Sequence, residues 1–140
     1  MNQELAERCV EQMISRDGFS AWLGVTVENV APGTARVSMK VRSEMLNGFG
    51  VCHGGVTYSL ADSALAFAAN THGRVAVSIE SSMTYPKKVL EGDVLTAEAY
   101  EQSTTARIGI YQITVCRADG EKVALMRGIV YRTKEQFFPE

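Results

Sequence analysis

The chain has 140 residues, of which 46% are hydrophobic and 21% charged, and its formal net charge is −2. This length and composition are typical of one folded domain, so we expect residues 1–140 to form a single domain. The slight acidic excess disfavours a nucleic-acid partner, and no apolar run reaches the roughly 18 residues that a membrane-spanning helix needs. The acidic start of the chain leads into no apolar signal segment, so we expect a cytoplasmic protein that contacts no membrane.

The three cysteines, Cys9, Cys52 and Cys116, are far apart and do not have the spacing of metal ligands. An odd number of cysteines at such spacing indicates reduced thiols. Since His53 and His72 are the only histidines, the sequence predicts no metal site built from the protein's own side chains.

The part of the chain before residue 42 is expected to form two helical segments and a pair of strands. In chain order these are a helix at 3–16 within an N-terminal segment of residues 1–17, a short turn at 19–23, and strands at 25–30 and 35–41. The helix is indicated by Leu5, Cys9 and Met13, which recur on one helical face. Between the strands, Pro32 presets φ and Gly33 accepts a positive φ, so the strands are expected to form a hairpin.

The longest apolar run of the chain, residues 54–71, is expected to be a helix buried in the core, because it is apolar on nearly all sides. Gly73 is expected to end this helix as a C-cap residue. Runs rich in β-branched and apolar residues predict four more strands, at 75–85, 94–102, 107–117 and 122–133. Asp119-Gly120 is a strong signal for a hairpin between the last two strands.

The order of these elements is strand, strand, long helix and four strands, and most of the connections are short enough for hairpins. This order indicates an α+β fold in which an antiparallel sheet carries helices on one face. A six-stranded antiparallel sheet wrapped around one long central helix is the hotdog architecture, and the predicted order of elements fits it.

Asp62 is the only charged residue of the apolar helix. Burying a lone carboxylate is costly, so the group either finds partners or shifts its pKa. A perturbed carboxylate in a cleft is a candidate for chemistry, so Asp62 is a candidate catalytic residue. The alternative is a carboxylate that only caps or bridges at a subunit interface.

The start of the same helix is polar and rich in glycine. The usual Ser, Thr, Asp or Asn cap is missing, and His53 precedes Gly54 and Gly55 instead. The first amide N–H groups of a helix have no partner within the helix, so here they are expected to point at a ligand oxygen. Such donors are suited to an oxyanion hole for a carbonyl that becomes tetrahedral.

The spacing of Gly54 and Asp62 has a consequence for the site. Asp62 follows Gly54 by eight residues, which is roughly 12 Å along a helix that rises 1.5 Å per residue. Asp62 therefore cannot touch a carbonyl that is held at Gly54 of its own chain. If both groups act on one substrate, the carboxylate must come from a second subunit, and we expect an active site shared across a twofold dimer.

Three features at these spacings, Asn47, His53-Gly54-Gly55 and Leu60-Ala61-Asp62, resemble the motif of the hotdog-fold acyl-CoA thioesterases of the phenylacetate-degradation type. The resemblance extends from about Phe19 to Thr133. It implies that the substrate is a coenzyme A thioester of a small or aromatic acid, such as phenylacetyl-CoA or hydroxyphenylacetyl-CoA, and that water is the acceptor. It also implies that no metal or redox cofactor takes part, and that the protein is a homotetramer built from two hotdog dimers.

By this resemblance, four residues take part in catalysis. The Gly54 N–H polarises the thioester carbonyl, and the partner subunit's Asp62 activates water as a general base or attacks as a nucleophile. Asn47 orients the water or the carbonyl. His53 forms a hydrogen bond near the thioester and holds the loop.

Five further residues are expected to contact the substrate: Gly55, Tyr58, Ser78, Lys87 and Lys88. Tyr58 lies close to the start of the helix, and Ser78 matches a serine that some relatives place beside the carboxylate. Lys87 and Lys88 stand where relatives often carry Arg-Pro. Lysine binds phosphate as a point charge, so we expect the two lysines to contact the phosphates of coenzyme A.

Other functions fit parts of the pattern. A hotdog dehydratase or hydratase needs a histidine with an acidic partner, and a non-catalytic acyl-CoA binding module would not need a buried carboxylate. Cys52 beside His53 suggests a nucleophile pair, but adjacent side chains usually point apart. The segment Gly48-Phe49-Gly50 lacks the third glycine and the parallel strands of a dinucleotide site.

Overall fold

The structure is a computed structural model that describes residues 2–139. The ends of the domain expected from the sequence, Met1 and Glu140, lie outside these residues. The helical segments are α1 (Gln3–Arg16), α2 (Gly18–Leu23), the 3-10 turn η1 (Ser43–Met45) and α3 (Gly54–Ala69). The strands are β1 (Thr26–Ala31), β2 (Thr34–Lys40), β3 (Arg74–Thr84), β4 (Val94–Thr104), β5 (Ile108–Arg117) and β6 (Lys122–Gln136).

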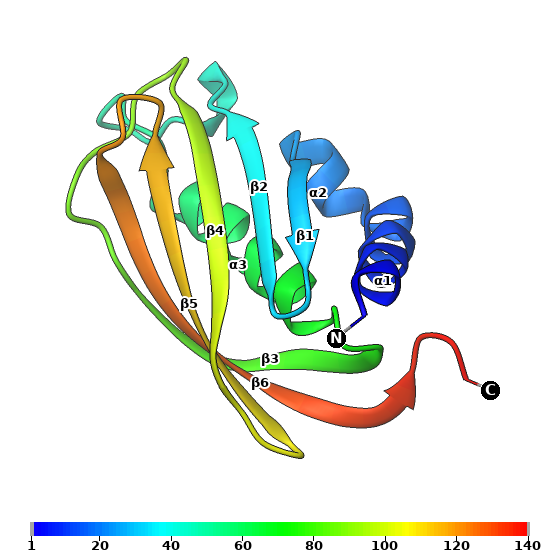
Figure 1. Ribbon diagram of the computed structural model, residues 1–140. Helices are drawn as coiled ribbons and strands as arrows, with labels where there is room; N and C mark the ends of the chain where they lie inside the picture. The colour runs from blue at the N-terminus through cyan, green and yellow to red at the C-terminus, as the bar shows by residue number, and fades with distance from the viewer. Residues whose placement is uncertain (1, 140) are drawn as a thin grey trace.

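The strands form one six-stranded sheet in the order β1-β2-β4-β5-β6-β3, and each neighbouring pair is antiparallel. The sheet is strongly curved and wraps around α3, while α1 and α2 lie beside β1 (Figure 1). This arrangement confirms the predicted α+β hotdog fold. The order also leaves one side of β3 unpaired within residues 2–139, because β3 pairs only with β6 at the edge of the sheet.

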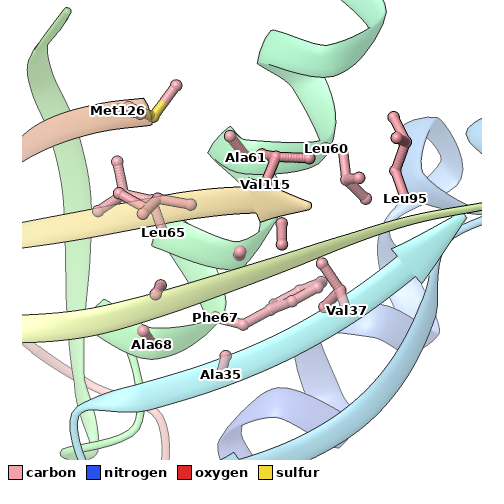
Figure 2. Close-up of a cluster of buried hydrophobic side chains, with 14 of the residues drawn as sticks. Ala35, Val37, Leu60, Ala61, Leu65, Phe67, Ala68, Leu95, Val115 and Met126 are labelled. Atoms are coloured by element: carbon pink, nitrogen blue, oxygen red, sulfur yellow. The ribbon is translucent and has the colours of Figure 1, made fainter. Parts of the chain in front are cut away.

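The core lies between α3 and the concave face of the sheet. Leu60, Leu65 and Phe67 of α3 are completely buried there. Figure 2 shows them in one cluster with side chains from β2, β4, β5 and β6. Alanines on α3, such as Ala61 and Ala68, are also completely buried, so the helix is apolar on nearly all sides because the sheet surrounds it.

The predicted end of the central helix was wrong. The helix ends at Ala69 and is capped by Asn70 rather than by Gly73. The Asn70 amide donates to the carbonyls of Ala66 at 2.8 Å and of Ala76 at 3.1 Å, and its oxygen accepts from the Ala76 N–H at 2.8 Å. One side chain thus caps the helix and anchors the start of β3. Gly73, with φ +91°, serves the turn between them instead.

The other predicted elements are present with shifted ends. The first helix begins and ends at the expected residues, and all six expected strands form. The last strand, β6, extends to Gln136, beyond the predicted end at Thr133. Of the helices in residues 2–139, none is both long enough and apolar enough to cross a membrane.

The sheet packs tightly against α3 at Gly128 in β6. A Cβ atom placed on Gly128 would lie 2.5 Å from Cδ2 of the buried Leu65. We expect Gly128→Ala to destabilise the protein by about 1–3 kcal/mol, the usual cost of overpacking a core, as measured by denaturant unfolding. Gly18→Ala is the matched control, because nothing lies within 4 Å of the added methyl group. Equal stability of the two variants would contradict this account of the core.

Candidate active site

The start of α3 is capped by a side chain that the sequence analysis did not recognise as a cap. His53 is the N-cap residue, and its Nδ1 accepts a hydrogen bond from the Gly55 N–H at 2.9 Å. The His53 carbonyl accepts from the Val56 N–H at 2.9 Å. The expectation of an uncapped helix start was therefore wrong, and the Gly55 N–H is not free for a ligand. Because Nδ1 is an acceptor, the neutral ring carries its proton on Nε2.

The Gly54 N–H is the exception in the first turn. It donates to no atom of residues 2–139, whereas the next two amides are both bonded to His53. This single donor lies at the positive end of the helix dipole. The structure therefore leaves at Gly54 the kind of N–H group that an oxyanion hole requires.

Asn47 organises the loop that leads to the helix. Its Oδ1 accepts from the Phe49 N–H at 2.9 Å and from the Val51 N–H at 3.3 Å. Its own N–H donates to the Val51 carbonyl at 2.8 Å. The side-chain oxygen is thus committed to the turn, and only the amide NH₂ group is left to act on a substrate.

Asp62 is half-buried on α3, and its carboxylate has neither a hydrogen bond nor an ion pair within residues 2–139. Burial raises the pKa of this carboxyl above its ordinary value. An unpaired carboxylate in a partly dry environment has the features of a general base.

The two expected contacts near Asp62 differ in their surroundings. Tyr58 lies one helical turn before Asp62, and its hydroxyl forms a hydrogen bond with Ser81 of β3. This bond ties α3 to the edge strand. Ser78 lies further along β3, opposite Val130 of β6, and its side chain is exposed.

A cavity of about 320 Å³ adjoins the start of α3. Gly54 lines it together with Tyr85, Lys87 and Lys88 from the connection between β3 and β4, which Figure 1 shows running to the same end of the molecule. The structure thus brings the free donor and the two lysines together. Asn47, His53, Tyr58, Asp62 and Ser78 do not line this cavity.

The loop that carries the lysines is held by the hairpin between β5 and β6. Lys87 Nζ lies 3.3 Å from Glu121 Oε1, and Arg117 donates to the Lys88 carbonyl at 3.1 Å. Both lysines are exposed, so they are accessible to a charged ligand.

Cys52 and His53 do not form a nucleophile pair. The Cys52 thiol is buried, lies 3.9 Å from Thr57 Oγ1, and has a pKa that burial raises above its usual value. A raised pKa disfavours the thiolate, which is the nucleophilic form. The His53 Nδ1 is already bonded to Gly55.

Tyr85 is a residue of this site that was not predicted from the sequence. Its hydroxyl donates to the Gly54 carbonyl at 2.9 Å, and its ring lies against the Gly54 Cα. In the sequence Tyr85 is only the last residue of a predicted strand, and nothing in the spacing connects it with a helix that starts 31 residues earlier.

A curved six-stranded antiparallel sheet around one long helix defines a hotdog-fold protein. The chain belongs to the Thioesterase superfamily, whose family model matches residues 49–124. It is therefore a thioester hydrolase.

Comparison with individual proteins agrees with this assignment. The acyl-coenzyme A thioesterase PaaI of Escherichia coli is 36% identical over 120 residues, which cover 86% of each chain. Acyl-coenzyme A thioesterase 13 of Homo sapiens is 33% identical over 129 residues, 89% of this chain and 91% of that one. The structure of the E. coli PaaI protein superposes with a TM-score of 0.94 at 33% identity, covering 96% of this chain and 97% of that chain.

The raised pKa of Asp62 has a consequence for stability. The folded chain holds the Asp62 proton more tightly than the unfolded chain, so stability falls as pH rises through the interval between the two pKa values. Above that interval the ionised carboxylate destabilises the folded wild type, and Asp62→Asn removes this destabilisation. We expect Asp62→Asn to raise the thermal midpoint at pH 7 by a few degrees, with the gain disappearing below about pH 4.

Asp119→Asn is the control for this measurement. Asp119 is exposed, and hydrogen bonds from the Glu121 N–H and from Arg117 lower the pKa of its carboxyl. Its removal is expected to leave the midpoint unchanged or to lower it. A midpoint at pH 7 that is lower for Asp62→Asn than for the wild type would show that the carboxylate is stabilised by a partner.

Proposed function

We propose that this chain hydrolyses coenzyme A thioesters of small or aromatic acids, with water as the acceptor and without a cofactor. The main support is Gly54, whose N–H has no acceptor within residues 2–139 and which lines a cavity together with Lys87 and Lys88. The names of the E. coli and human relatives support an acyl-CoA substrate. The E. coli structure is of a protein from the phenylacetic acid degradation operon, which supports phenylacetyl-CoA or hydroxyphenylacetyl-CoA as the first substrates to test.

In the proposed mechanism the thioester carbonyl oxygen accepts a hydrogen bond from the Gly54 N–H. Attack by water makes the carbonyl carbon tetrahedral and places negative charge on this oxygen, at the positive end of α3. One well-placed donor of this kind lowers the barrier by about 3 kcal/mol. Collapse of the intermediate breaks the carbon–sulfur bond and releases the acid and coenzyme A.

The general base or nucleophile in this proposal is the partner subunit's Asp62. Asp62 and Gly54 of one chain are separated by two helical turns, and the carboxylate has no partner within residues 2–139 of its own chain. The edge strand β3 supports pairing with a second copy, because its outer side is unpaired and Val77 and Ile79 are 48% and 57% exposed. A twofold dimer would contain two sites, and two such dimers would form the proposed tetramer.

Other residues have supporting roles in this proposal. His53 holds the Gly55 N–H and thereby fixes the helix start. Asn47 shapes the loop and offers its NH₂ group to the water or the carbonyl. Lys87 and Lys88 contact the phosphates of coenzyme A, while Tyr58 and Ser78 flank the carboxylate and the acyl group.

The two alternatives fit the geometry less well. A dehydratase or hydratase needs a histidine that an acidic group orients, but the His53 Nδ1 is bonded to a backbone amide. A binding module has no use for a half-buried carboxylate whose pKa is raised by burial.

Removal of the carboxylate should abolish most of the activity. We expect Asp62→Ala to lower kcat by roughly 10²–10⁴, the range for lost acid–base assistance, while the fold and oligomer are kept. Thiol release is measured from phenylacetyl-, hydroxyphenylacetyl-, benzoyl-, short-chain and long-chain CoA. Protein without substrate controls for the three cysteines. An unchanged kcat in this variant would exclude Asp62 from the mechanism.

Sharing of the site between subunits is tested by mixing variants. Asp62→Ala and His53→Ala subunits are each expected to be weakly active alone. A mixed dimer contains two sites, of which one has both native residues. Each mixed dimer should therefore have up to about half of the activity of a wild-type dimer. If subunits exchange but no activity returns, each site is confined to one chain.

A further inference from the structure

Gly54 and Gly55 stand side by side at the start of α3. Glycine has the widest choice of φ and ψ, so two in succession do not by themselves fix the direction of an N–H group. A donor acts in catalysis only if it is already oriented before the reaction begins. The structure must therefore hold this unit by other contacts.

Two side chains hold the Gly54–Gly55 peptide at its opposite ends. The Tyr85 hydroxyl donates to the Gly54 carbonyl at 2.9 Å, and the His53 Nδ1 accepts from the Gly55 N–H at 2.9 Å. The peptide before Gly54 is also held, because the His53 carbonyl accepts from the Val56 N–H at 2.9 Å. Both peptides that flank the Gly54 Cα are thus fixed, and only the Gly54 N–H is left unbonded.

The Tyr85 ring lies on the side of Gly54 where a side chain would project. A Cβ atom on Gly54 would lie 3.4 Å from both Cζ and the hydroxyl oxygen of Tyr85, which is an ordinary van der Waals contact. Tyr85 is 47% exposed and forms part of the cavity wall. Burial, together with nearby Tyr58, raises the pKa of the Tyr85 phenol, so the hydroxyl keeps its proton at neutral pH.

The position of Tyr85 in the chain connects the two parts of the proposed site. Pro86, Lys87 and Lys88 follow it directly, and all three line the same cavity as Gly54. One hydrogen bond thus sets the start of the loop that carries the lysines against the start of the helix that carries the donor.

We propose that Tyr85 is a positioning residue that orients the Gly54 N–H toward the thioester carbonyl. This inference rests on the proposed function. Tyr85 touches the Gly54 carbonyl, in the peptide that follows the donor N–H, rather than the reacting atoms. Its hydroxyl therefore helps to stabilise the transition state by orienting Gly54, whereas Lys87 and Lys88 contribute to the binding of coenzyme A.

The test is Tyr85→Phe, which removes only the hydroxyl and keeps the ring. We expect kcat to fall by about tenfold, with KM changed by less than about twofold and an unchanged oligomer. Lys88→Ala should show the opposite pattern, a raised KM with little change in kcat. Tyr100→Phe is the matched control, because Tyr100 is 49% exposed and its hydroxyl donates to Glu98 of β4, away from α3.

A second measurement does not depend on turnover. Amide hydrogen exchange of Gly55 is followed by NMR in the wild type and in the Tyr85→Phe and Tyr100→Phe variants. Faster exchange in Tyr85→Phe alone is expected, because the peptide has lost one of its two anchors. If no thioester is hydrolysed by the wild type, the proposed function fails. The exchange rate of Gly55 still tests whether the Tyr85 hydroxyl holds the Gly54–Gly55 peptide. Wild-type kcat or unchanged Gly55 exchange in Tyr85→Phe would overturn the inference.

Discussion

The site depends on the enclosure of α3 by the curved sheet. Completely buried side chains such as Leu60, Leu65 and Phe67 fix the axis of the helix and its rotation about that axis. Once the helix is fixed, the unbonded Gly54 N–H lies at its start and Asp62 lies two turns further on. A loosely packed core would let both groups shift. The close packing of the sheet against the helix therefore also fixes the positions of the residues of the site.

Much of the fold was accessible from the sequence, and the reason is periodicity. The alternation of apolar residues in the strands and the all-round apolar character of α3 are local signals, so all six strands and the central helix could be predicted. The two errors at the ends of α3 have another origin. His53 is not a usual N-cap residue, and Asn70 caps the helix through contacts that include Ala76 of the next strand. Helix ends are decided by such contacts, which have no periodic signal.

The sequence indicated which residue types belong to the candidate site, but not which segments of the chain meet there. Asp62 stands out in the sequence because it is a charge in an apolar run, and Gly54 because a glycine pair begins a helix. Tyr85 gives no such signal, since its contact with Gly54 depends on how the connection after β3 returns to the helix. The polar groups around α3 are treated differently by the fold. The Asp62 carboxylate is left without a hydrogen-bond partner within residues 2–139, whereas the Gly55 and Val56 N–H groups at the helix start are bonded to His53.

The alanine-rich surface of α3 brings the sheet so close that even Gly128 has no room for a methyl group beside Leu65. This part of the interior is consequently filled. In the proposed mechanism the thioester lies at the start of α3, where Gly54 lines a cavity together with residues of the surface loops, and the residues that select the acyl group belong there. Substrate preference can then change during evolution, or in the laboratory, by substitutions that leave the folding core as it is.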